Sequence, residues 1–357
     1  MSSLADLSDF NKNITGSAPL NFEKDVSLFN TSIDCPQNGA IPGFKGSAGV
    51  DLNGKVNGNV DYGVAIAGTI VPPNIDEFGI FVNLDTTVTG TLGIDATLTV
   101  SVSQRVWIPA SSNWYIQGSI GTGSIPLFET GIPGLDFPKI LSIGPTFSVN
   151  AEADATLDAN VNLDVDIDYD IKGAQLFFPP SSNNNGGGSF VPGDSNLKLS
   201  VSPDVTSNGQ IAAHLIPTLA FGIDLLSGKA KATISLDVDA HAGVDLSLTA
   251  AAKASTDGTK STAFGGCVDI TTGLDVNANA DADLLSFFNK DAKVTLFSKT
   301  FDLFKKCFGD STARRAYTGR AARAALLAKR ADLGCPISAL AGAASVVEEA
   351  VPASKIV

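Results

Sequence analysis

Four aspartates at alternate positions are the first candidates for ligand chemistry in this sequence. Asp164, Asp166, Asp168 and Asp170 are separated by apolar residues, and an extended strand places such alternating side chains on one face. Carboxylate oxygens are the ligands that calcium prefers. Neighbouring carboxylates on one strand lie about 6.5–7 Å apart, so one ion needs further ligands from an adjacent strand. We expect a solvated acidic face that resists aggregation, with low-affinity calcium binding as the functional alternative, and no other cofactor.

Aromatic side chains that could contact a ligand are concentrated in one short segment. Trp107, Trp114 and Tyr115 flank a Pro-Ala-Ser-Ser-Asn turn, and the chain has no other tryptophan. Aromatic rings offer large and rigid contact surfaces, so this segment predicts a low-affinity ligand or glycan site. The alternative is a hairpin whose aromatic side chains pack against each other across two strands.

The two histidines are the only imidazoles available for acid–base or metal chemistry. His241 lies on the polar side of an alternating segment, as do Asp239 and Asp245, and His214 lies upstream. A hydrolase would also need an activated nucleophile. The sequence has no Gly-x-Ser-x-Gly, His-Glu-x-x-His or phosphate-binding Gly-Lys-Ser/Thr motif. We therefore interpret both histidines as surface residues and assign no catalytic residue.

The composition excludes several classes of protein. Of the 357 residues, 44% are apolar, which supports a large hydrophobic core and argues against disorder throughout. With 37 acidic and 24 basic residues the formal charge is −13, which disfavours nucleic-acid binding. No apolar stretch reaches the roughly 20 residues of a transmembrane helix.

The elements that must position these side chains are predicted by long alternation of apolar and polar residues. An alternation of period two indicates a strand with one buried face. The fold class is therefore all-β, an elongated antiparallel β-sandwich or rolled sheet with very long strands and a short helical C-terminal tail. The alternating stretches cover residues 50–70, 80–102, 150–172, 234–248 and 268–284. We interpret residues 150–172 as one uninterrupted strand.

One long-stranded domain is expected between two atypical ends. Residues 1–45 are predicted to be irregular, residues 46–310 to form the β domain, and residues 311–357 to form a basic tail that is partly helical or disordered. Within the domain, residues 71–77 predict the turn of a long hairpin. Residues 179–196 predict a flexible surface loop rather than a boundary between two domains.

Prolines and glycines predict where the sheets bend or end. Residues 125–145 carry prolines that exclude a central strand, so we expect an extended crossover that covers one edge or end of the core. Five glycines within the alternating stretches are predicted to mark bulges or bends. They are Gly54, Gly58, Gly90, Gly93 and Gly243.

The basic tail holds a candidate processing site. Lys329 and Arg330 precede a segment of small residues, and such a dibasic pair suits a protease of the secretory pathway. An exposed basic helix is the equally good alternative. Residues 315–330 and 336–350 both have helix propensity.

Cysteines and glycosylation sequons favour secretion. Asn13 and Asn30 each begin an Asn-x-Ser/Thr sequon. Four cysteines allow three pairings, and we predict that Cys267 pairs with Cys307 and that Cys35 pairs with Cys335. The second bridge would keep the tail attached after cleavage at Arg330. The first residues carry acid where a signal peptide needs basic and apolar stretches. We expect a secreted protein whose signal peptide is absent from this sequence, and a cytosolic chain without any signal peptide is the alternative.

Several segments resemble an uncharacterised family of secreted fungal proteins, classed as a domain of unknown function. The likeness covers residues 35–310. It rests on Gly68-Thr-Ile-Val-Pro-Pro73, Gly131-Ile-Pro-Gly-Leu-Asp-Phe-Pro138 with Ile143-Gly-Pro145, Cys267-Val-Asp-Ile270, Leu296-Phe-Ser-Lys299 and Phe304-Lys-Lys-Cys307. It implies a fungal extracellular or cell-surface protein with basic processing sites near the C-terminus, and it transfers no functional residue.

Together these patterns predict a non-enzymatic, secreted structural or interaction protein of the fungal cell wall or extracellular matrix. Its partners would be a cell-wall polysaccharide or a lipid, and exposed strand edges would allow self-assembly. A lipid- or glycan-binding β module and a carbohydrate-active enzyme are the alternatives.

Overall fold

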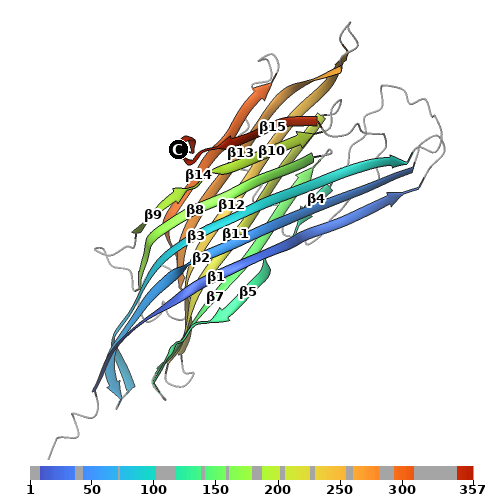
Figure 1. The fold of residues 1–357 in the computed structure, drawn as a ribbon. Coiled ribbons are helices and arrows are strands. Elements are labelled where there is room, and N and C mark those ends of the chain that lie inside the picture. The colour runs from blue at the N-terminus through green and yellow to red at the C-terminus, as the bar shows by residue number, and fades with distance from the viewer. Residues whose placement is uncertain are drawn as a thin grey trace, which may run out of the picture.

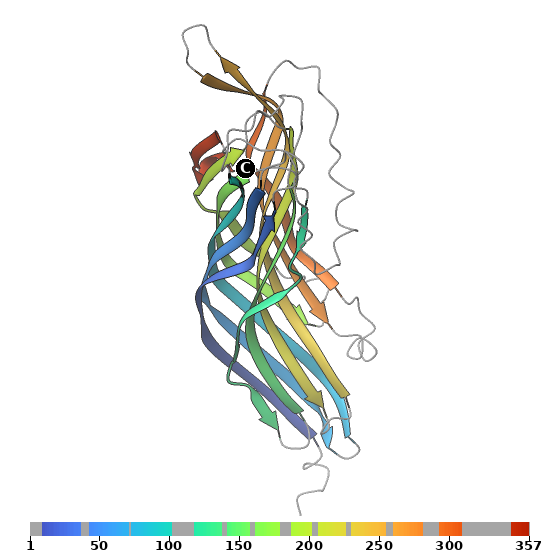
Figure 2. The ribbon, with the colours of Figure 1, turned by 90° about the vertical axis from the view of Figure 1, so that its right-hand side faces the viewer.

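The computed structural model consists of two antiparallel sheets packed face to face (Figures 1 and 2). This confirms the predicted all-β sandwich. The structure describes residues 9–36, 43–70, 73–101, 118–137, 141–157, 161–178, 187–201, 206–225, 230–254, 260–280, 293–308 and 344–356.

The first sheet has the strand order β1-β2-β3-β8-β10-β15, and β9 pairs with β8. Its strands are β1 (Asp9–Cys35), β2 (Gly43–Ile70), β3 (Pro73–Ser101), β8 (Val161–Phe178), β9 (Gly187–Pro192), β10 (Ser195–Val201) and β15 (Ala344–Val351).

The second sheet has the order β14-β13-β12-β11-β7-β4, and β5 and β6 also pair with β7. Its strands are β4 (Gly118–Gly121), β5 (Ile125–Gly131), β6 (Leu135–Phe137), β7 (Leu141–Leu157), β11 (Thr206–Leu225), β12 (Ala230–Ala254), β13 (Lys260–Ala280) and β14 (Lys293–Phe308).

The core lies between the sheets and is filled from both sides. Alternating side chains of each long strand are buried, most of them Val, Leu, Ile and Ala. The rings of Tyr62 and Phe221, which belong to opposite sheets, have centroids 5.9 Å apart. A Cβ added to Gly54 would lie 3.3 Å from the methyl groups of Leu215. These contacts show that the inner faces of the sheets touch directly.

The uninterrupted alternation of residues 150–172 predicted one strand, and this prediction is wrong. β7 ends at Leu157 and β8 begins at Val161, and the two strands belong to different sheets. Odd-numbered residues are buried in both, among them Ala153 and Leu163. The chain therefore changes sheets while odd positions keep facing the shared core, which is why the sequence pattern continues across the break.

The N-terminal region differs from the irregular segment expected for residues 1–45. β1 pairs with β2 from Asp9 to Cys35. A bulge between Ser27 and Phe29 shifts its register, so the apolar residues change parity along the strand. This change hides the alternation that would have predicted a strand.

The long hairpin is confirmed, but its turn is shorter than predicted. β2 and β3 pair from Gly43 and Ser101 to Ile70 and Pro73. Residues 73–77, assigned to the turn, therefore belong to β3. Pro73 is the first residue of its strand, a position where the missing N–H is tolerated.

The predicted positions of the bulges are wrong. Pairing runs without a register shift through all five glycines named above. A shift occurs instead where β3 pairs with β8, between Leu84 and Thr86. There Gly173 adopts φ +61°, and its N–H donates a hydrogen bond of 2.7 Å to the carboxylate of Asp85. A positive φ of this kind favours glycine.

Residues 125–137 of the proline-rich segment form β5 and β6 at the edge of the second sheet, as predicted. β5 and β6 both pair with the edge of β7. The expectation is wrong for residues 141–145, which begin β7, an interior strand that also pairs with β11. Pro145 is tolerated there because it lies opposite the break between β5 and β6.

The segment 179–196, expected to be a loop, contains β9 and the start of β10. Residues 344–351, expected to lie in a tail that is partly helical or disordered, form β15 and pair with β10. The helical part of the described tail is only one 3-10 turn, Ala353–Lys355.

Candidate functional site

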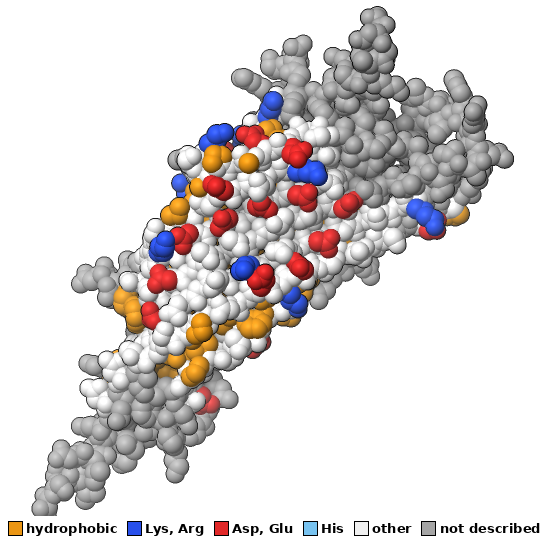
Figure 3. Space-filling model, in the orientation of Figure 1, with side chains coloured by type: hydrophobic (Ala, Val, Ile, Leu, Met, Phe, Trp, Pro, Cys, Tyr) orange, Lys and Arg blue, Asp and Glu red, His pale blue; other side chains and the backbone are white. Residues whose placement is uncertain are grey.

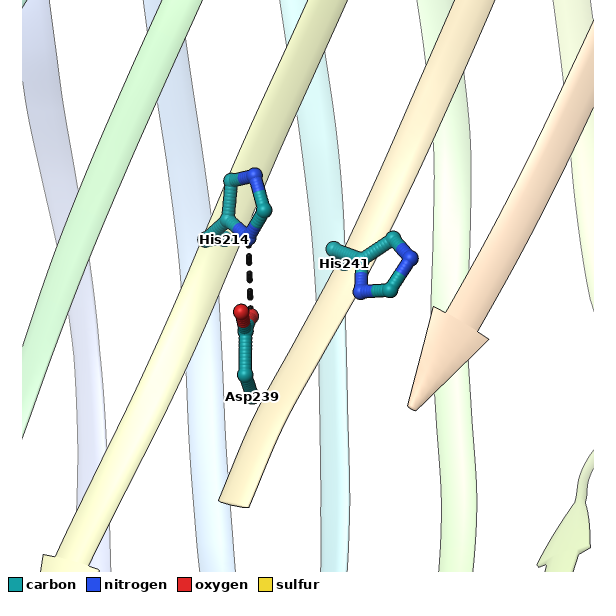
Figure 4. Close-up of side chains that lie close together, drawn as sticks. All are labelled: His214, Asp239 and His241. Carbon is teal, nitrogen blue, oxygen red and sulfur yellow. Dashed lines mark hydrogen bonds and ion pairs between the residues drawn. The ribbon is translucent and has the colours of Figure 1, made fainter. Parts of the chain in front are cut away.

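Two histidines and an aspartate meet on the outer face of the second sheet (Figure 4). One ligand atom of each of His214, Asp239 and His241 lies within 4.8 Å of those of the other two. The His214 Nδ1 and an Asp239 carboxylate oxygen are 2.8 Å apart and share a hydrogen bond. The two imidazole centroids are 5.3 Å apart. We call these three residues the His–Asp–His cluster.

The register of one hairpin brings the cluster together. β11 and β12 pair at Leu225 and Ala230, where β11 ends and β12 begins. Eleven residues away from this pair along each strand, His214 pairs with His241 (225 − 214 = 241 − 230 = 11). Asp239 precedes His241 by two positions and so lies on the same face of β12. The neighbours Ala213, Leu215, Ala240 and Ala242 point into the core, which fixes all three cluster residues on the outer face.

The cluster is partly withdrawn from solvent. The side chains of His214 and Asp239 are 21% and 24% exposed. The Nδ1 of His241 is buried and has no hydrogen-bond partner within the described part of the chain. Burial lowers the pKa of His241, although the negative charge of Asp239 partly opposes this. His241 is thus held neutral, with a ring nitrogen able to donate an electron pair.

Gly273 determines where the His241 ring lies. Gly273 pairs with His241 across β12 and β13. A Cβ at this position would overlap the Nε2 side of the imidazole. The ring therefore rests over the glycine, and its Nδ1 side faces the pair formed by His214 and Asp239 (Figure 4).

Further carboxylates surround the cluster. Glu152 on β7 pairs with His214, and Asp275 acts electrostatically on His241. Burial raises the pKa of Asp154 on β7, while the positive charge of His214 opposes the rise. The site thus combines two imidazoles with several acidic groups. This set has the donors of a metal site.

A family model described as a domain of unknown function (DUF7223) matches residues 8–309. The chain belongs to this family. The match spans both sheets, including the strands that carry the His–Asp–His cluster. No curated protein and no solved structure matches the chain. Among the described residues, no helix has the length and apolar character needed to cross a membrane.

The four aspartates predicted as a calcium site lie on the outer face of β8, because the odd-numbered residues between them are buried in the core. Asp166 accepts hydrogen bonds from Thr91 and Asn196, at 2.8 and 2.7 Å. Asp170 pairs with Lys172 at 2.5 Å. Burial, followed by the charges of neighbouring aspartates, raises the pKa of Asp168. Within the described residues the ligand groups that converge are those of the His–Asp–His cluster, so calcium binding by the β8 aspartates stays a prediction.

Some of the other predicted site residues lie in the described strands, and the rest lie outside the described residues. Cys267 and Cys307 form a disulfide between β13 and β14. Asn13 and Asn30 are both exposed on β1. The aromatic residues Trp107, Trp114 and Tyr115, the dibasic pair Lys329 and Arg330, and Cys335, the predicted partner of Cys35, lie outside the described residues.

The His–Asp–His cluster was not predicted from the sequence, because His214 and His241 lie on different strands and their pairing was not considered. The alternation correctly placed His241 on a polar face with Asp239. Residues 226–229 could have indicated a hairpin turn, since Ser227 and Gly228 are typical turn residues. Counting outward from that turn pairs position 214 with position 241.

Proposed function

We propose that this protein is a secreted, non-enzymatic structural or interaction protein of the fungal cell wall or extracellular matrix. The observation that carries the proposal is the filled interior of a sandwich built from very long strands. Such a body is rigid, and its outer faces and edges are the surfaces available for partners.

The inner faces of the sheets meet at several levels. Phe22 of β1 packs on Phe128 of β5, with ring centroids 5.9 Å apart. Elsewhere the hydroxyl groups of Tyr169 and Thr272, from opposite sheets, are 2.8 Å apart. Phe190 of β9 stacks on Phe297 of β14 at 4.4 Å. A lipid carrier needs an apolar cavity to enclose its ligand, and these direct contacts favour a packed body instead.

The outer face of the first sheet is acidic and rich in uncharged polar groups (Figure 3). Its exposed residues include Asp51, Asp61, Asp95, Thr87 and Thr91. Carboxylates accept hydrogen bonds and threonine hydroxyls both donate and accept them, so a broad face of this kind complements the hydroxyl groups of an extended polysaccharide. We propose a neutral cell-wall polysaccharide as the partner.

Two features support the secretory pathway. The disulfide between Cys267 and Cys307 is a bond that persists in oxidising compartments. Asn13 and Asn30 are exposed, as glycan acceptors must be. The bulge in β1 places both asparagines on the outward face although their numbers differ in parity. β1 ends the strand order of the first sheet, so a glycan at each site would shield a free edge.

Co-sedimentation with purified fungal cell walls tests this proposal. We expect the protein to bind walls and purified glucan or chitin, and to bind less when Thr87 and Thr91 are both replaced by Ala. The matched control replaces Thr233 and Ser247, which are exposed on the second sheet, by Ala and should bind normally. Failure of the unaltered protein to bind walls or either polysaccharide would refute the proposed role.

A further inference from the structure

We propose that the His–Asp–His cluster binds one transition-metal dication, zinc or copper. The ligands are the His214 and His241 imidazoles and the Asp239 carboxylate on the outer face of the second sheet. This site is independent of the structural role proposed above.

The donor atoms define the class of metal. Two imidazole nitrogens and one carboxylate oxygen suit zinc, copper, nickel or iron, whereas calcium and magnesium take oxygen ligands. Among the divalent ions, copper binds such sites most strongly, followed by zinc and nickel. A site with only three protein ligands keeps at least one position for water or a further ligand. Glu152, which pairs with His214, stands at the register position from which a fourth ligand would come.

The distances need only small adjustments. Two ligands bonded to one zinc ion at about 2.1 Å lie about 3.0–3.4 Å apart. The His214 Nδ1 and the Asp239 oxygen are already 2.8 Å apart, and every pair of ligand atoms is within 4.8 Å. A change in side-chain torsion of His241 can close the remaining gap without moving a strand.

An unexplained polar atom points independently to a ligand. The buried Nδ1 of His241 lacks a hydrogen-bond partner within the described residues, and leaving a buried polar group unpaired destabilises a fold. Gly273 holds the ring so that this atom faces His214 and Asp239. A metal bound between the three side chains would satisfy it.

The pairing of β11 with β12 fixes the positions of the three ligands. His214 and His241 are directly opposed on adjacent strands, and Asp239 shares the strand of His241. Each ligand is therefore carried by a hydrogen-bonded strand interior, where the backbone is rigid, and the neighbouring small residues Ala240 and Ala242 anchor β12 in the core. A preorganised ligand set of this kind lowers the cost of binding.

Isothermal titration of the full chain, stripped of metal with a chelator, tests the site with zinc and separately with calcium. We expect one zinc ion per chain and no competition by calcium. His214→Gln and His241→Gln should each lower the zinc affinity at least about 100-fold, more than loss of a supporting residue around a metal. Asp245→Asn is the matched control, because Asp245 is exposed on the same face of β12 and its replacement should leave affinity unchanged.

Electron paramagnetic resonance of the unaltered protein with one equivalent of copper gives a second readout that does not depend on the variants folding. Two imidazole ligands predict nitrogen hyperfine coupling from two equivalent nitrogens. The absence of such coupling would overturn the proposal. So would zinc affinity that is the same in the unaltered protein and in the two histidine variants.

Discussion

A hydroxyl pair that bridges the two sheets gives a quantitative test of the packing. Tyr169 on β8 and Thr272 on β13 are 0% and 2% exposed, and their hydroxyl oxygens are 2.8 Å apart. Thr272 in turn donates to the backbone carbonyl of His241 at 3.1 Å. Because the Thr272 hydroxyl has only one proton and donates it to that carbonyl, the Tyr169 hydroxyl is the donor to Thr272. Burial raises the pKa of Tyr169.

The two single substitutions should differ from the double one in a defined way. Tyr169→Phe removes one buried hydrogen bond and should lower the free energy of unfolding by about 1 kcal/mol. Thr272→Val leaves the Tyr169 hydroxyl buried without an acceptor and should cost about 1–3 kcal/mol. The double variant removes both polar groups, so it should be more stable than the sum of the single effects predicts, by about 1 kcal/mol.

Urea unfolding followed by circular dichroism, with refolding checked, measures these values. Tyr62→Phe combined with Thr272→Val is the control, because the Tyr62 hydroxyl donates elsewhere, to the carbonyl of Pro133 at 2.5 Å. Effects at that pair should add within about 0.5 kcal/mol. Additive effects at Tyr169 and Thr272 would refute the direct contact between the inner faces at this level.

Three further predictions concern stability. Replacing Cys267 and Cys307 by Ser removes a disulfide of sequence separation 40. The free energy of unfolding should fall by about 4 kcal/mol on the chain-entropy model. An unchanged urea midpoint would contradict this stabilisation by the disulfide. Gly173→Ala forces a side chain onto φ +61° and should cost about 1–2 kcal/mol, measured by urea unfolding; no loss would contradict the bulge. Folding raises the pKa of Asp168, so ionisation of its carboxyl destabilises the folded state. The free energy of unfolding is therefore highest below the pKa of Asp168 in the unfolded chain, and it falls as the pH rises through the pKa in the folded protein. Asp168→Asn should therefore stabilise the protein slightly at neutral pH, since solvent screens charges on a partly exposed side chain. The gain should shrink as the pH falls toward about 4, the ordinary aspartate value. A gain independent of pH in thermal unfolding would refute this cause.

The sequence predicts the faces of the strands better than their partners. Alternation showed that odd residues near Leu163 and even residues near Val238 face a core, because a strand places every second side chain on the same side. It did not show that β7 and β8 belong to different sheets, because the pattern is local and both strands face the same core.

Long-range pairing accounts for what the sequence could not predict. Residues 344–351 have helix propensity, yet they form β15 because β10 offers a free edge nearly 150 residues earlier (344 − 201 = 143). Tertiary pairing of this kind overrides local preference. The His–Asp–His cluster was hidden for a related reason, since only the register of β11 against β12 shows that His214 meets His241.

Native mass spectrometry of the protein secreted from a fungal host tests whether the interior of the sandwich is filled. We expect the mass of the polypeptide with glycans that Asn13→Gln and Asn30→Gln remove, with no lipid bound and with at most one metal ion per chain. A lipid bound in one-to-one ratio that survives gentle activation would contradict it, because the interior would then have to open into a cavity.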